Sequence, residues 1–205
     1  MSILHPPQPH PPLTEPLWAP APEFPHLPVD ELHLWRVRME KPRWESEEDA
    51  CPVSRDRTEK MATALFRRDV LGRYTPPHSP SLTAGPASGL KLTIAQCDHL
   101  ALIAVSRNVR EVGLDLERVR HDLPIEEMAG GFLDARSQWD LRITWSPEEK
   151  AWKFFQFWTS NEACAQAQPS SRTPCLGFSP EADFIAALAI QGGPEARVVY
   201  WDWQC

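Results

Sequence analysis

The chain of 205 residues has no apolar run near the ~18–20 residues that a membrane-spanning helix requires. It also lacks a basic start followed by an apolar core, the pattern of a signal peptide. There is no basic excess, because 21 Lys and Arg residues stand against 28 Asp and Glu residues, for a net charge of -7. A general nucleic-acid binder carries the opposite balance. We therefore expect a cytoplasmic protein that binds neither membrane nor nucleic acid.

The five cysteines are scattered and include no CxxC pair, which argues against a zinc site and a disulfide framework. Proline, by contrast, is concentrated, since residues 1–28 hold ten of the 22 prolines. Such a segment forms neither a helix nor a β-ladder. It is either a disordered tail or a segment docked on the body through Leu17, Trp18 and Phe24, and the sequence leaves both possibilities open.

Periodicity predicts the first regular elements. Residues 31–40 alternate polar and apolar side chains with a slip of one residue, which predicts a strand. The expected inner face of this strand comprises Leu32, Leu34, Val37 and Met39. Apolar side chains at helical spacing predict a helix over residues 54–74.

One pattern occurs twice. The stretch DHLALIAV at 98–105 resembles DFIAALAI at 183–190, and a polar turn and a second apolar run follow each of them. We interpret this as a hairpin used twice. It predicts an α+β fold built as a pseudo-dimer of two similar halves, residues 29–118 and 119–205, with a site at their seam.

Two carboxylates interrupt the apolar run after the first copy. Asp115 and Glu117 share one face of a strand, while Leu114 and Leu116 point the other way into a core. Carboxylates this close repel each other unless a cation lies between them. The alternative interpretation is structural, with both acids on the rim and paired to neighbouring arginines at 118 and 120.

A helix beginning near Ser146 supplies a third carboxylate. Ser146, Pro147 and Glu149 form a strong helix start. The expected apolar stripe comprises Ala151, Phe155 and Trp158. Glu162 continues this stripe, so we expect it to point inward beside Asp115 and Glu117 unless a nearby Arg or Lys pairs with it. Three oxygen ligands of this kind suit Mg²⁺.

The segments VGLDLERVR and FFQFWTSNEACAQA together resemble the 4'-phosphopantetheinyl transferases, in particular the larger surfactin-synthetase-type class. That family shows G-(V/I)-D-(V/I)-E and, further on, F-x-x-x-W-x-x-K-E-A. The resemblance implies a monomer built from two similar halves that form a pseudo-dimer. It also implies that the protein uses Mg²⁺ and coenzyme A and modifies a serine of an acyl or peptidyl carrier protein. It assigns Asp115, Glu117 and Glu162 as metal ligands, with Asp115 and Glu162 also catalytic.

The chain departs from the family at several cationic positions. Asn161 and Gln166 replace lysines, and Gln96 stands where a histidine contacts coenzyme A. Arg55, Arg57 and Arg68 are the expected compensating contacts, together with Gln96. Because these cations are lost, two alternatives stay open. The same fold could act on a carrier-bound thioester, by cyclisation or elimination, in polyketide or nonribosomal peptide biosynthesis, or it could bind a carrier protein without catalysis.

Three further side chains invite a functional interpretation. His99 could replace the missing histidine, although a turn residue is the simpler interpretation. Cys97 and Cys164 could act as nucleophiles, but no histidine is placed by the sequence to activate either thiol.

Overall fold

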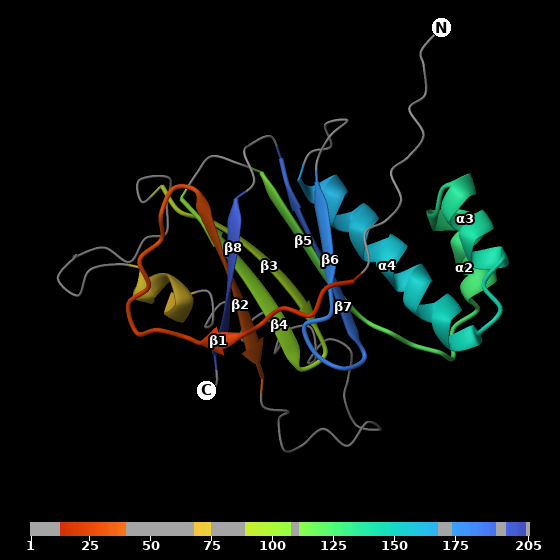
Figure 1. The fold of residues 1–205 in the computed structure, drawn as a ribbon, viewed down its shortest axis with the longest axis horizontal. Helices are drawn as coiled ribbons and strands as arrows, with labels where there is room; N and C mark the ends of the chain where they lie inside the picture. Colours follow the sequence, from red (N-terminus) through yellow and green to blue (C-terminus); the bar gives the residue numbers. More distant parts are fainter. Residues whose placement is uncertain are drawn as a thin grey trace, which may run out of the picture.

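The computed structural model describes residues 13–39, 68–74, 89–107, 111–167, 174–191 and 196–203. It confirms the α+β class, because two β-sheets pack together and helices cover their outer faces (Figure 1). No helix within these ranges combines the length and apolarity that crossing a membrane requires.

The first sheet has five strands in the order β1-β8-β2-β4-β3. Their bounds are β1 Ala19–Pro20, β8 Arg197–Trp203, β2 Glu31–Arg38, β4 Leu100–Ser106 and β3 Lys91–Cys97. The second sheet has three strands in the order β5-β7-β6, namely β5 Val112–Arg118, β7 Phe184–Ile190 and β6 Cys175–Phe178. The helices are α2 Ile125–Phe132, α3 Ala135–Arg142 and α4 Pro147–Gln166, and residues 68–73 are also helical.

Apolar side chains fill three layers between these elements. The inner faces of the two sheets meet in a core that includes Leu34, Leu102, Leu114 and Leu188. The outer face of the first sheet packs against the segment 68–74. Helix α4 covers the outer face of the second sheet. The two sheets therefore share one interior, and each carries its own helical cover.

Strand β2 has two buried faces and no slip. Its pairing with β4 runs without interruption from Leu32 to Arg38. Leu32 and Leu34 enter the core between the sheets, while Trp35 and Val37 are buried on the opposite face. The predicted single inner face with a slip is wrong, because a strand covered on both sides needs no polar face.

The interpretation of a hairpin used twice is also wrong. Strand β4 is followed by β5 in the other sheet, and β7 is followed by β8 back in the first sheet. The real hairpins are β3–β4 and β6–β7, which lie one step earlier in the chain. In both, an aspartate at positive φ precedes the second strand, at 52° for Asp98 and 63° for Asp183. The sequence likeness therefore marks equivalent hairpin turns, and a polar connector alone did not reveal which strands pair.

The last strand joins the sheet of the first predicted half. Strand β8 runs parallel to β2, with Leu34 opposite Tyr200. Strand β5, from the first predicted half, pairs with β7 in the second sheet. Each sheet thus contains a strand from the other half, so backbone hydrogen bonds within each sheet join the two predicted halves.

The proline-rich segment is docked along the body over residues 13–28. Thr14 exchanges backbone hydrogen bonds with β6 and its turn, donating to Gly177 at 3.2 Å and accepting from Ser179 at 3.0 Å. Further on, β1 pairs with β8 of the other sheet. Trp18 packs against the core between the sheets, at 5.3 Å from the ring of Tyr200. The docked alternative is therefore confirmed for residues 13–28 through Trp18 and the backbone pairing, but Leu17 and Phe24 are exposed and do not anchor the segment. Residues 1–12 lie outside the described residues.

Candidate functional site

Strand β5 carries Asp115 and Glu117 on the face that looks toward α4. Leu114 and Leu116 point the other way and are buried in the core between the sheets, as predicted. On the helix-facing side, a Cβ on Gly113 would lie 1.8 Å from the carbonyl oxygen of Ala163. Helix α4 therefore crosses β5 at backbone contact, and the half-buried carboxylates follow directly along this face.

Helix α4 begins as the sequence predicts. The hydroxyl of Ser146 accepts a hydrogen bond from the backbone N–H of Glu149 at 3.2 Å, and Pro147 occupies the first turn. The buried face contains the predicted Ala151 and Phe155, but Trp158 is only half-buried. The whole buried face comprises Ala151, Phe154, Phe155, Phe157, Thr159, Ser160 and Ala163. Glu162 is exposed, so the expectation that it points inward is wrong. The reason is that phenylalanines on adjacent turns, rather than Trp158, define the buried stripe.

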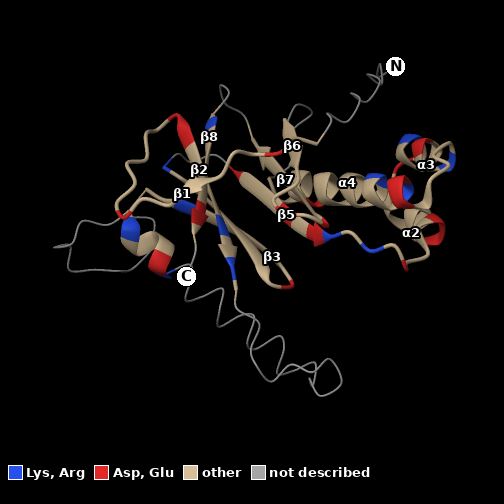
Figure 2. Ribbon diagram, turned by 60° about the horizontal axis from the view of Figure 1, so that its bottom comes forward, with Lys and Arg blue, Asp and Glu red and all other residues tan. Residues whose placement is uncertain are grey.

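The charge of Glu162 nevertheless acts on both strand carboxylates. Burial raises the pKa of Asp115 to about 7, and the negative charges of Glu117 and Glu162 add to the effect. Burial also raises the pKa of Glu117, where Arg120 opposes the rise and Glu162 contributes to it. Glu162 therefore lies close enough to act on both strand acids. Figure 2 marks the acidic residues of β5 and α4 in red.

Neighbouring arginines form no ion pair with these acids in the part of the chain that the structure describes, although the charge of Arg120 acts on Glu117. Within the described residues, neither Asp115 nor Glu117 forms an ion pair. The guanidinium of Arg118 binds Asp98 instead, at 3.2 Å. The Oδ2 atom of Asp115 is buried and has no hydrogen-bond partner. A buried carboxylate oxygen without a partner is costly, so this position would gain from a cation.

The donor types fit Mg²⁺, which prefers carboxylate oxygens. The unpartnered Oδ2 of Asp115 supports that fit. However, no group of three or more acidic, histidine or cysteine side chains in the described ranges is arranged to hold a metal ion. Magnesium binding by Asp115, Glu117 and Glu162 therefore stays a prediction.

The two sheets meet edge to edge beside this site. Strands β3 and β5 lie side by side, and the hydroxyl of Thr93 donates to the backbone oxygen of Val112 at 2.9 Å. Lys91 and Glu111 form an ion pair at 2.5 Å at the same edge. Gln96 lies on β3, half-buried, on the strand face of Leu92 and Ile94, which is opposite to the face that enters the core between the sheets.

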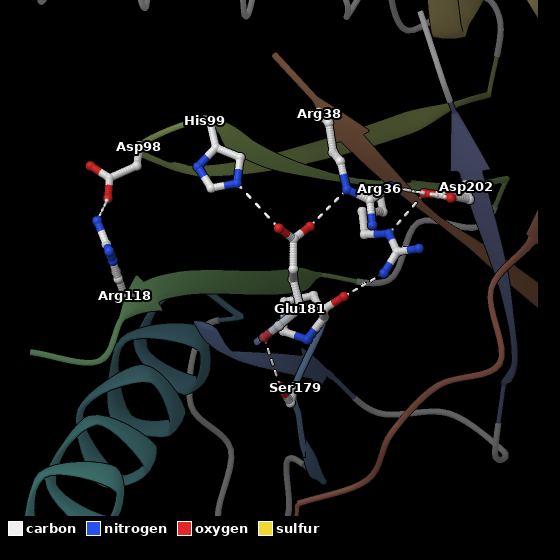
Figure 3. Close-up of polar contacts among 9 residues, drawn as sticks. Arg36, Arg38, Asp98, His99, Arg118, Ser179, Glu181 and Asp202 are labelled. Carbon is white, nitrogen blue, oxygen red and sulfur yellow. Dashed lines mark hydrogen bonds and ion pairs between the residues drawn. The ribbon is translucent and has the colours of Figure 1, made fainter. Parts of the chain in front are cut away.

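A polar network closes one end of the seam (Figure 3). Glu181, in the turn between β6 and β7, accepts from Arg38 at 2.7 Å and contacts His99 at 3.2 Å. Asp202 of β8 accepts from Arg36 at 2.8 Å and from Arg38 at 3.0 Å. The network ties turns of both sheets together, and it occupies the Nε2 atom of His99 that the sequence left as a substitute phosphate ligand.

Sequence reasoning missed this network. The only signal was the alternation of arginines in the stretch WRVR of β2, which read as solvent-facing polar positions. Their acidic partners stand more than 140 positions later in the chain, at Glu181 and Asp202.

No protein-family model matches the sequence. The 4'-phosphopantetheinyl transferase HetI of Nostoc sp. (strain PCC 7120) is 29% identical to it over 176 residues, which cover 73% of each chain. This similarity to a 4'-phosphopantetheinyl transferase supports the resemblance that the sequence motifs indicate.

The two residues that stand in place of the family's lysines have different surroundings. The side-chain oxygen of Gln166 accepts a hydrogen bond from the backbone N–H of Leu114 at 3.1 Å. Gln166 thus provides the hydrogen-bond acceptor for a backbone N–H of β5. Asn161 is exposed beside Glu162 and could accommodate a longer side chain.

The residues predicted to contact coenzyme A are not gathered at one place. Arg55 and Arg57 lie outside the described residues. Arg68 is exposed and binds Asp69 at 3.2 Å at the start of the helical segment 68–73. Cys97 cannot serve as a ready nucleophile, because burial and the charge of Glu117 raise the pKa of its thiol to about 11.

Proposed function

We propose that this chain transfers the 4'-phosphopantetheine arm of coenzyme A to a serine of an acyl or peptidyl carrier protein. The observation that carries the proposal is the buried, unpartnered Oδ2 of Asp115 beside Glu117, with the charge of Glu162 acting on both acids, in a chain similar to a 4'-phosphopantetheinyl transferase. These are the residues that the family pattern assigns to the metal.

The three carboxylates would hold Mg²⁺, with Asp115 as the buried anchor. When bound, the ion would neutralise charge on the pyrophosphate of coenzyme A. Without a cation, the pKa of Asp115 stays at about 7, so the site carries part of a proton near neutral pH. Binding of the ion would be coupled to release of that proton.

The chain's own residues would then handle the proton of the reaction. The serine oxygen of the carrier protein forms a bond to the β-phosphorus, and the bond from that phosphorus to the bridging oxygen breaks. The products are the phosphopantetheinyl serine and 3',5'-adenosine diphosphate. Glu162 is exposed and so can meet a serine on a partner protein, and we assign it as the group that accepts the serine proton.

Binding of coenzyme A would depend on few cations. Arg55, Arg57, Arg68 and Gln96 are the proposed contacts to the cofactor. Each lost charge-assisted contact to phosphate is worth ~1.5–3 kcal/mol. We therefore expect a higher KM for coenzyme A than in members that keep both lysines of the motif.

A direct test incubates the protein with coenzyme A, Mg²⁺ and a panel of unmodified carrier proteins, followed by intact-protein mass spectrometry. The expected result is a mass gain equal to the phosphopantetheine arm on at least one carrier. Glu162→Gln should abolish the gain, while Glu148→Gln, an exposed acid in the first turn of the same helix, should leave it unchanged. If no carrier gains mass while a known transferase modifies all of them, the proposal fails.

The same assay distinguishes the alternatives. A carrier that binds without gaining mass indicates a binding module. Turnover of an acyl group already attached to a modified carrier indicates a thioester-directed enzyme. The similarity to a transferase favours neither alternative.

A further inference from the structure

Two cysteines from different elements meet at the far end of α4. Cys164 lies in the last turns of the helix, and Cys175 is the first residue of β6. Both side chains are half-buried and pack against the same cluster of alanines, and each thiol shifts the pKa of the other. All three described cysteines, these two and Cys97, are free thiols.

Small side chains explain how the two sulfurs approach. Helix α4 packs on the second sheet here through Ala163 and Ala167, which touch Ala187 and Ala189 of β7. Cys175 stands directly opposite Ala189 in the pairing of β6 with β7, so it lies beside the helix contact. Both cysteines pack against this alanine cluster. With only methyl groups between helix and sheet, the backbones come close enough for side chains as short as cysteine to meet.

We propose that Cys164 and Cys175 form a redox modification site, in which hydrogen peroxide converts the two thiols into a disulfide that joins α4 to β6. One sulfur attacks the peroxide, its S–H proton is released, and a sulfenic acid and water form. The second sulfur then displaces hydroxide from the sulfenic acid, losing its own proton, so the S–S bond forms and a second water leaves. Two electrons pass from the thiols to the peroxide. A thiol reductant returns both cysteines to the free state.

The proposal stands apart from phosphopantetheine transfer, because it needs neither coenzyme A nor a carrier protein. Cys97 provides an internal contrast. It lies in the core between the sheets, whereas the pair lies at the α4 contact, and within the described ranges no other cysteine packs with it. We therefore expect Cys97 to stay reduced under the same treatment.

Peptide mapping of the folded full-length chain tests the proposal. Treated with hydrogen peroxide, alkylated and digested with trypsin without reductant, the protein should give a disulfide between peptides 154–172 and 173–197. Reductant should release both peptides. Cys164→Ser and Cys175→Ser should each remove the linked species, while Cys97→Ser should keep it.

Two results would overturn the proposal. One is full alkylation of both peptides after peroxide treatment of the folded protein. The other is a link that forms only after unfolding in urea, which would show that the native fold keeps the sulfurs from bonding. Since Cys→Ser variants could alter folding, circular dichroism of each variant accompanies the mapping, and the wild-type comparison of folded with unfolded protein decides the matter without any substitution.

Discussion

A Cβ atom on Gly113 would lie 1.8 Å from the carbonyl oxygen of Ala163 and 2.9 Å from the backbone nitrogen of Ala167. Strand β5 and helix α4 therefore touch backbone to backbone. Because the atoms in contact belong to the backbone, no rotation of a side chain can make room for an added Cβ. Gly113→Ala should thus lower the free energy of unfolding by about 3 kcal/mol, the upper part of the range for overpacking, as measured by urea denaturation.

A matched control exists in α2. Gly130 has no atom within 4 Å of its ideal Cβ position and lies inside the helix. Gly130→Ala should stabilise the protein by about 0.5–1 kcal/mol, because alanine is the better helix former. Equal effects of the two substitutions would contradict the close contact.

The raised pKa of Asp115 should make the stability of the folded protein fall as the pH rises. The unfolded chain loses this proton near the ordinary aspartate pKa of 3.8, whereas the folded protein keeps it until about pH 7. Without Mg²⁺, stability should therefore fall as pH rises from 4 to 7, with a slope of at most ~1.4 kcal/mol per pH unit from this group. Asp115→Asn should remove that slope and be the more stable protein at pH 8, in thermal unfolding followed across pH.

Magnesium should reverse the effect in the wild type. A cation between the carboxylates favours their charged forms, so added Mg²⁺ should raise the melting temperature of the wild type at pH 8 and leave Asp115→Asn unchanged. An equal shift in both proteins would mean that the ion binds elsewhere. This test needs no substrate.

The seam network should contribute measurable stability. Burial alone would raise the pKa of Glu181, but hydrogen bonds and charges of Arg38 and His99 outweigh it and lower the pKa below its ordinary value. Glu181→Gln should cost about 1–2 kcal/mol at pH 7. The difference from wild type should shrink as pH falls through the lowered pKa, because the wild-type carboxyl then becomes neutral as well. Chemical denaturation at several pH values measures both.

The exposed pair of Glu126 with Lys150 provides the comparison for Glu181. Glu126→Gln removes a solvent-exposed partner at the surface and should leave the unfolding transition unchanged. A loss as large as that of Glu181→Gln would show that the seam network is not special.

The two replaced lysines should respond differently when restored. Asn161→Lys adds a cation at an exposed position beside Glu162 and should lower the KM for coenzyme A about tenfold without changing stability. Gln166→Lys removes the acceptor of the Leu114 N–H and should cost about 1 kcal/mol of stability. Steady-state kinetics and urea denaturation separate the two. A KM unaffected by Asn161→Lys would place the coenzyme A phosphates away from this turn of α4.

The sequence predicted the local elements that carry the site. Alternation placed Leu114 and Leu116 in the core and the two acids opposite them, since one strand face follows directly from the period of two. The capped start of α4 at Ser146 was equally readable. The orientation of Glu162 was not, because the buried stripe of a helix depends on which neighbour it packs against, and the alanine contacts with β7 were not visible in the spacing.

The pairing of the strands was the larger part of the fold that could not be predicted from the sequence. Adjacent apolar runs suggested hairpins, but β4 and β5 belong to different sheets. Nothing in a two-residue alternation states which partner a strand takes, and the parallel pairing of β8 with β2 joins residues more than 160 positions apart. The Arg38–Glu181 and Gln166–Leu114 contacts depend on that long-range arrangement.

The place of β8 between β1 and β2 imposes an order on biosynthesis. On a ribosome, the hairpin of β3 and β4 and strand β2 emerge long before residues 197–203, so the first sheet stays open along the β2 edge while the second sheet and α4 are being made. An exposed strand edge of this kind invites pairing with other chains. A nascent chain stalled before its final strand would therefore be the form most prone to aggregate, and a supplied peptide with the sequence of β8 should rescue it.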